Sequence, residues 1–310
     1  MDPLIILSGP TAVGKTALSI ELAKVIGGSI ISADSMQVYK GMDIGTAKIS
    51  ADKQQGIPHY LIDVLDPADD FNVVTFKHMA EEAIAHIISE GRIPVIVGGT
   101  GFYIQSVLYD IDFSDHEVMN GYRRELSDLI EEKGGEYVHR MLEEVDDRAA
   151  RHIHFNDSKR MIRALEYYKQ TGQRISDHNS EESRKISPYN YCYFVLTDDR
   201  QKIYDRINER VDKMIEEGLV GEVSSLIESG VGINCISMQG IGYKEIIRYL
   251  DGECTLDEAA DMIKKNSRHF AKRQLTWFAR EKNVIYIDKR QTEDPLGSIL
   301  SEIKKAGITG

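Results

Sequence analysis

The chain is poor in the residue that forms disulfides and structural metal sites, with three cysteines among 310 residues. Cys192, Cys235 and Cys254 lie far apart, and none belongs to a CxxC or Cys/His pattern, so the sequence predicts neither a disulfide framework nor a zinc site. No apolar run reaches the ~18 residues of a membrane span, and the first residues lack the basic start and apolar core of a signal peptide. We therefore expect a cytoplasmic protein with no membrane partner.

An excess of positive charge is also missing, because 38 Lys and Arg face 50 Asp and Glu, giving a net charge of −12. This balance argues against a protein that coats nucleic acid or an anionic membrane. A hydrophobic content of 42% with only 7 prolines excludes the disordered and low-complexity classes. The charge is nevertheless uneven: residues 264–282 hold seven Lys and Arg and one acid, a local charge of +6, which leaves −18 on the rest.

The length corresponds to about two domains at ~150 residues each, and the patterns along the chain show how they are arranged. Over the first hundred residues, short β-branched runs predicted as strands (4–8, 29–33, 59–64 and 93–97) alternate with helical patterns (15–25 and 73–89), which is typical of a parallel sheet. Strand signals vanish between about 115 and 188 and return at 191–197. Predicted helices follow at 200–217, 220–229, 244–249 and 256–282, then a strand at 284–287 and a closing helix.

These patterns predict an α/β fold with an insertion rather than two domains in tandem. The expected fold is a P-loop NTPase-like three-layer body with a parallel sheet, formed by residues 1–114 and 189–310. An all-helical domain, residues 115–188, is inserted into this body, and the carboxyl-terminal portion of the body is helical.

A phosphate-binding motif follows the first predicted strand and precedes the first predicted helix. Gly9-Pro10-Thr11-Ala12-Val13-Gly14-Lys15-Thr16 matches GxxxxGK[ST] in full. The glycines allow successive N–H groups to point inward, the helix start adds the positive end of its dipole, Lys15 adds an ammonium, and the Thr16 hydroxyl suits Mg²⁺. The motif predicts a site for two linked phosphates but does not say what these phosphates are attached to.

The carboxylate expected nearest to this site is Asp34, at the end of the strand predicted at 29–33. The carboxyl ends of parallel strands open onto one crevice, so Asp34 should face the phosphates. Its position alone allows a general base, a group behind a Mg²⁺ ion, or a cap for the following turn. The strand predicted at 93–97 ends in Gly98-Gly99-Thr100-Gly101, where a hydrolase would want an acidic residue, and Asp63 is predicted to form a turn.

Several blocks of sequence, spread nearly from end to end, together resemble the tRNA dimethylallyltransferase (tRNA isopentenyltransferase) family, and this set is far more specific than the P-loop alone. Because no zinc-finger pattern follows these blocks in the sequence, we expect a member that resembles the bacterial form. The blocks are residues 9–16, 32–48 (SADSMQVYKGMDIGTAK), 97–101 (VGGTG), 157–166 (DSKRMIRALE), 206–214 (RINERVDKM), 239–245 (QGIGYKE) and 271–277 (AKRQLTW).

The resemblance implies transfer of the dimethylallyl group from dimethylallyl diphosphate to N6 of the adenine 3′-adjacent to the tRNA anticodon. Because this N6 is a poor nucleophile, the reaction needs a carboxylate to take the proton, a role that falls to Asp34. The P-loop, with Mg²⁺ near Thr16, would hold the departing diphosphate. Thr11 and Thr100 match positions near the diphosphate and the reacting base. Arg206 or Arg210 is expected on the diphosphate; spacing does not decide between them, and we take Arg210.

The resemblance also implies a tRNA interface on both parts of the chain, with the target base swung out of the anticodon loop to reach Asp34. A monomer is the default expectation, since one chain supplies every block. The residues implied in tRNA binding are Asp34, Ser35, Met36, Gln37, Thr100, Arg123, Ser158, Lys159, Arg160, Met161, Ile162, Gln239, Gly240, Ile241, Gly242, Tyr243 and Lys244.

Basic residues on two predicted helices support an RNA partner but also have a plainer interpretation as solvated faces. Spacings of three and four place Arg163 beside Lys159 and Arg160. On the last long helix, Lys265, Arg268, Lys272, Thr276 and Arg280 predict a phosphate-binding track, whereas Phe270, Trp277 and Phe278 are predicted to face the core. An ATP-dependent kinase, a prenyltransferase of free adenylate and a non-catalytic binding module remain the alternatives.

Overall fold

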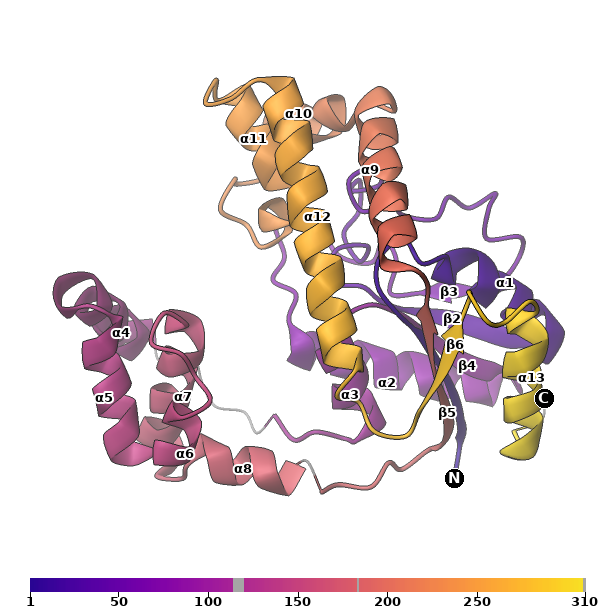
Figure 1. Ribbon diagram of the computed structural model, residues 1–310, viewed down its shortest axis with the longest axis horizontal. Helices are drawn as coiled ribbons and strands as arrows, with labels where there is room; N and C mark the ends of the chain where they lie inside the picture. The colour runs from indigo at the N-terminus through magenta and orange to yellow at the C-terminus, as the bar shows by residue number, and fades with distance from the viewer. Residues whose placement is uncertain (114–119, 183, 309–310) are drawn as a thin grey trace. The chain divides into compact units, whose positions relative to one another are not determined.

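The computed structural model describes residues 1–113, 120–182 and 184–308. The chain forms two compact units, one made of Met1–Leu108 with Pro188–Gly310 and the other of Tyr109–Ser187 (Figure 1). The predicted domain boundary at 114–115 falls outside the described residues. Among the described residues, none of the helices is both long and apolar enough to cross a membrane.

The first unit is built on a six-stranded, all-parallel sheet with the strand order β3-β2-β4-β1-β5-β6. Its strands are β1 (Pro3–Ser8), β2 (Gly28–Ala33), β3 (His59–Tyr60), β4 (Ile93–Gly98), β5 (Asn190–Thr197) and β6 (Val284–Asp288). The strand predicted at 59–64 is wrong beyond Tyr60, since Leu61 and Asp63 have φ angles of 60° and 55° and turn the chain. The turn predicted at Asp63 is confirmed.

Helices cover both faces of the sheet, which confirms the predicted three-layer body. α1 (Lys15–Ile26) and α13 (Pro295–Lys305) pack against each other and against the sheet, while α2 (Val73–Ser89) packs with α3 (Gly101–Leu108). The central strands read as continuous apolar runs because both of their faces are covered, and β1 is buried from Leu4 to Ser8. The carboxyl ends of β1, β2, β4, β5 and β6 therefore meet at one edge, where the loops of the site begin.

A helical portion follows β5, as the sequence predicts. It contains α9 (Arg200–Glu216), α10 (Leu219–Glu228), the short 3₁₀ helix η1 (Ser237–Gln239), α11 (Tyr243–Leu250) and α12 (Leu256–Phe278). α12 begins at a capping box formed by Thr255 and Glu258, and it packs on α9, α11 and α3. It ends at Phe278, four residues before the predicted end.

The second unit is helical throughout its described secondary structure and has a core of its own. Its helices are α4 (Asn120–Lys133), α5 (Gly135–Val145), α6 (Asp147–Ala150), α7 (Ser158–Thr171) and α8 (Ile175–Glu182). The Asp157 carboxylate caps α7 by accepting a bond from the backbone N–H of Arg160. The core is formed by Leu126, Val138, Leu142, Ala149, Ala150, Met161, Ala164 and Leu165.

Candidate functional site

The loop between β1 and α1 has the strained backbone that a phosphate cradle requires. Gly9 has a φ of 143°, and a Cβ there would lie 2.5 Å from the Leu196 carbonyl oxygen. Gly14 has a φ of 97°, a backbone angle that residues other than glycine rarely adopt. α1 begins at Lys15, so its free N–H groups lie at the loop. The sequence motif therefore folds as its spacing predicts.

Lys15 lies folded back into this loop. Its Nζ donates to the carbonyl oxygens of Gly9, at 2.9 Å, and Pro10, at 2.8 Å. Burial and the nearby charge of Arg210 lower the pKa of Lys15 to about 7, against an opposing effect of Asp34. An anion in the cradle would favour the ammonium form, so Lys15 is suited to take up a proton when a diphosphate binds.

The two candidate arginines of α9 have different partners. Arg206 forms an ion pair with Asp198 at 2.5 Å, and the Asp198 side chain is only 6% exposed. Arg210, one turn further along, directs Nη1 toward the Thr11 hydroxyl at 3.4 Å. Asp198 is itself an acidic residue at the end of a strand next to β1, which the sequence reading missed. Arg206 is therefore engaged by Asp198, whereas Arg210 lies within reach of the P-loop residue Thr11.

Asp34 follows β2 and lies at the same edge of the sheet. Its Oδ1 accepts bonds from the backbone N–H groups of Met36 (2.9 Å) and Gln37 (3.3 Å), so this oxygen caps the following turn. Asp34 is half-buried and close enough to Lys15 to affect its pKa. The capping role and a role toward a ligand are therefore compatible, because they use different oxygens of one carboxylate.

Thr100 lies beside Asp34, at the start of α3. Its backbone N–H donates to the carbonyl oxygen of Ala33, and its own carbonyl accepts from Tyr103 and Ile104. Gly98 precedes it at a point of close contact, where a Cβ would lie 2.2 Å from the Ala33 carbonyl oxygen. The loop after β4 is thus held directly against the residue that precedes Asp34.

Gln274 on α12 is a site residue that the sequence reading included in a block of resemblance but did not select. Its Oε1 accepts the backbone N–H of Thr11 at 2.8 Å, and its Nε2 donates to the Gly99 carbonyl at 3.1 Å. The side chain is buried, and a Cβ at Gly99 would lie 2.1 Å from Nε2. No short-range signal could identify it, because 263 residues separate it from Thr11.

The residues after Asp34 are tied to the predicted tRNA-binding stretch 239–244 by one carboxylate. Glu222 on α10 accepts from three successive backbone N–H groups, those of Asp43 (2.9 Å), Ile44 (2.7 Å) and Gly45 (3.1 Å). It also accepts from the Tyr243 hydroxyl at 2.6 Å. Burial, followed by the charge of Glu222 beside it, raises the pKa of this hydroxyl. Tyr243 is buried, so its side chain supports the stretch rather than facing solvent.

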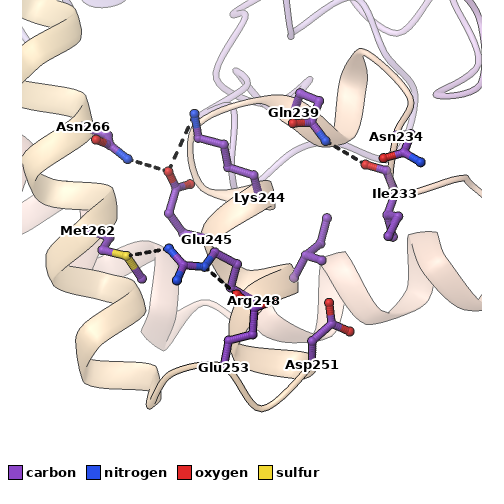
Figure 2. Close-up of a pocket in the computed structure, with 11 residues that line it drawn as sticks. Ile233, Asn234, Gln239, Lys244, Glu245, Arg248, Asp251, Glu253, Met262 and Asn266 are labelled. Atoms are coloured by element: carbon purple, nitrogen blue, oxygen red, sulfur yellow. Dashed lines mark hydrogen bonds and ion pairs between the residues drawn. The ribbon is translucent and has the colours of Figure 1, made fainter. Parts of the chain in front are cut away.

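Beside this stretch lies a polar pocket of about 420 Å³ (Figure 2). Its charged groups are mostly paired: Glu245 accepts from Asn266 at 2.7 Å and lies 3.9 Å from Lys244, while Arg248 holds Glu253 at 2.8 Å. Gln239 is exposed at its rim, and Ile241 is half-buried. Gly240 is close to Met36, since a Cβ there would lie 2.6 Å from the Met36 Cε. Two of the predicted tRNA-binding stretches therefore touch.

The second unit places its predicted tRNA-binding residues in different surroundings. Lys159 and Arg160 are exposed on α7, whereas Ser158 and Ile162 are half-buried. The Met161 side chain is fully buried in the core of this unit, where it supports the stretch 158–162 from inside.

The Arg123 guanidinium is engaged within the same unit. It holds the buried Glu166 through two nitrogens, with distances of 2.7, 2.9 and 3.0 Å. Arg163 lies 3.7 Å from the same carboxylate. Because Glu166 is fully buried, the pair with Arg123 is part of the packing of this unit.

α12 carries a basic stripe, which we define as Lys265, His269, Lys272, Arg273 and Thr276. All five are exposed and recur at spacings of three and four, on the side of the helix opposite Gln274. Two members of the predicted track lie off this stripe: Arg268 is half-buried and donates to Asn208 of α9, and the exposed Arg280 lies beyond the end of the helix. Of the predicted core aromatics, Phe278 is buried, whereas Phe270 and Trp277 are half-buried.

The described residues hold no cluster of three or more His, Cys, Asp or Glu side chains suited to a metal ion. Thr16 is exposed at the first turn of α1, next to Lys15. Mg²⁺ usually binds through one or two protein groups together with substrate phosphates and water. A single hydroxyl at the cradle therefore fits Mg²⁺ that is bound together with a diphosphate.

The chain is similar to known proteins over nearly its whole length. A family model described as IPP transferase matches residues 37–281. A tRNA dimethylallyltransferase from Lachnoclostridium phytofermentans is 55% identical over 305 residues, 98% of this chain and 97% of that protein. A full-length tRNA isopentenylpyrophosphate transferase from Bacillus halodurans is 43% identical, with a TM-score of 0.74 over 99% of this chain and 98% of that one. A eukaryotic dimethylallyltransferase acting on tRNA is 27% identical, with a TM-score of 0.83 over 99% and 80%.

Proposed function

Because the chain belongs to the IPP transferase family, we propose that it transfers the dimethylallyl group of dimethylallyl diphosphate to N6 of the adenine 3′-adjacent to the tRNA anticodon. The observation that carries this proposal is the placement of Asp34 beside a complete phosphate cradle, with Thr100 next to it. A nucleophile and a diphosphate electrophile brought to this edge of the sheet would meet between these groups.

In the proposed reaction the cradle holds the electrophile. The N–H groups at the start of α1, the Lys15 ammonium and the Arg210 guanidinium bind the diphosphate. As the bond between C1 of the allyl group and the diphosphate oxygen breaks, charge grows on the leaving group, and these fixed donors stabilise it. Thr16 would hold Mg²⁺ at the same phosphates, and the ion supplies further charge neutralisation.

Asp34 acts on the other substrate. The adenine N6 lone pair is delocalised into the ring, so attack on C1 is assisted when a base removes the proton. The C1–N6 bond forms while the proton passes to Asp34, and diphosphate leaves with the electrons of the broken bond. Oδ1 of Asp34 remains engaged by the Met36 N–H, which fixes the carboxylate and leaves Oδ2 for this proton.

The tRNA is proposed to bind through features on both units. The basic stripe of α12 offers Lys272 and Arg273 to phosphates, and the mutually touching stretches 34–37 and 239–244 would contact the anticodon loop around the extruded base. Lys159 and Arg160 of α7 offer a second basic surface. An acidic remainder of the chain would limit non-specific binding to other RNA.

The experiment that tests this function is transfer of radiolabelled dimethylallyl diphosphate to unmodified tRNA. Free AMP as acceptor, and ATP in place of the diphosphate donor, serve as controls. Label on tRNA and none on AMP is the expected result. Label on AMP alone would assign the chain to prenylation of free adenylate, and phosphoryl transfer from ATP would assign it to the kinases.

The role of Asp34 is tested by Asp34→Asn, which preserves the capping acceptor at Oδ1 but removes the base. We expect kcat to fall about 10²–10⁴-fold, the usual contribution of a general base, with tRNA affinity nearly unchanged. Asp205→Asn is a matched control, because Asp205 is exposed on α9 and bonds only Gln201 among the described contacts. Near-normal turnover by Asp34→Asn would contradict the assignment of the base.

A further inference from the structure

Gln274 joins two loops that have different roles in the proposed reaction: the P-loop holds the diphosphate, and the loop after β4 lies on the acceptor side. One of its amide atoms binds the P-loop at Thr11, and the other binds the loop after β4 at Gly99, the residue before Thr100. The orientation of the amide is fixed, because an N–H group requires the oxygen and a carbonyl requires the nitrogen. The side chain is only 6% exposed, so water does not readily replace either bond.

α12 delivers this side chain rigidly. One turn beyond Gln274, Trp277 packs so closely on Gly101 that a Cβ there would lie 2.1 Å from its Nε1. A second bond joins α3 to the residues just after α12, because Gln105 donates to Glu281 at 2.7 Å. Gly99 must be glycine for a similar reason, because the Gln274 amide occupies the space of a Cβ. The P-loop and the loop that carries Thr100 are therefore both held in position by α12.

We propose that Gln274 is a positioning residue that sets the spacing between the diphosphate cradle and the acceptor side of the site. This inference rests on the proposed function. Bond formation requires C1 and N6 to be held about 3–3.5 Å apart and in line, and an error of about 1 Å costs roughly 10²-fold in rate. Binding of each substrate alone depends on other groups, so loss of Gln274 should lower kcat much more than it affects either KM.

The test compares Gln274→Met, which keeps the size but cannot form the two bonds, with Gln274→Glu. A protonated Glu can accept from Thr11 and donate to Gly99 as the amide does, whereas an ionised Glu can only accept. We expect kcat of Gln274→Met to be about 10²-fold low at every pH, with each KM within about threefold of wild type. Relative to wild type, kcat of Gln274→Glu should rise as the pH falls, by up to about tenfold per unit.

Gln105→Met is the matched control, because it removes an amide that also joins α3 to the α12 region but binds no loop of the cradle. Melting temperatures measured at each pH separate loss of folding from loss of rate. A Gln274→Met enzyme with wild-type kcat, or a Gln274→Glu enzyme whose pH profile parallels wild type, would overturn the positioning role. A wild-type chain that transfers no dimethylallyl group to tRNA would instead contradict the proposed function.

Discussion

Arg206 and Arg210 are one helical turn apart on α9, yet replacing Arg210 should affect substrate binding, whereas replacing Arg206 should affect stability. Arg210→Gln removes a charged donor from the cradle, so we expect KM for dimethylallyl diphosphate to rise about 10–100-fold with little change in melting temperature. Arg206→Gln leaves the buried Asp198 carboxylate with the backbone N–H of Asp199 and the weaker influence of Lys289, and should destabilise the fold by about 1–3 kcal/mol.

Urea unfolding and steady-state kinetics on the two variants check this division. Arg206→Gln combined with Asp198→Asn should regain most of the lost stability, because the uncompensated charge is gone. If instead Arg206→Gln raised KM and Arg210→Gln lowered stability, the two roles would have to be exchanged.

The low pKa of Lys15 links binding of the diphosphate to proton uptake. With a pKa of about 7 in the free protein and a higher one beside bound phosphates, affinity is full below pH 7 and declines as the pH rises above it. At pH 8.5, where the phosphates of the ligand are ionised, calorimetry in buffers of different ionisation enthalpy should find nearly one proton taken up per site. Lys15→Arg, which stays charged, should abolish the uptake; equal uptake by both proteins would contradict the assignment.

At the scale of elements, α12 places Gln274 at the candidate site and carries the exposed basic stripe on its opposite side. Removing two charges of the basic stripe with Lys272→Gln and Arg273→Gln should weaken tRNA binding and lower the slope of log K against log salt by about 1–2. KM for dimethylallyl diphosphate should not change. The matched control is Lys304→Gln with Lys305→Gln, an equal change of charge on the exposed side of α13. An unchanged slope would remove the stripe from the tRNA interface.

Elements also differ in how far the sequence predicts them. The P-loop and Asp34 can be predicted from local patterns, because each directly follows a predicted strand. The structure places both where the sequence predicts them. Gln274, Glu222 and Asp198 were missed because each acts on partners that only tertiary packing brings near. The strand predicted to continue to residue 64 failed for a local reason, since its apolar residues continue through a turn with positive φ angles.

At the scale of the whole molecule, the two units have separate cores and should respond separately to damage. Arg123→Met removes the two-nitrogen ion pair to the buried Glu166 carboxylate, so we expect the second unit to lose about 1–3 kcal/mol of stability. Hydrogen exchange should speed up over residues 120–182 and stay unchanged in the strands of the sheet. Binding of dimethylallyl diphosphate should persist.

A second substitution distinguishes structure from tRNA contact at Arg123. Glu166→Gln added to Arg123→Met should restore part of the protection, since the buried charge that Arg123 balanced is then replaced by a neutral amide. Weaker tRNA binding by Arg123→Met with unchanged exchange over residues 120–182 would contradict the structural role and leave Arg123 as a direct tRNA contact.

The pairing of β1 with β5 has a consequence for synthesis of the chain. The ladder joins Leu4 to Tyr191 and Ser8 to Val195, so one side of β1 stays unpaired until the whole helical unit has been made. The helical unit consists of local contacts and can fold while it emerges, whereas the sheet must wait for its later strands. A nascent chain stalled before residue 190 therefore presents an open, apolar strand edge, the feature most prone to aggregation and most in need of a chaperone.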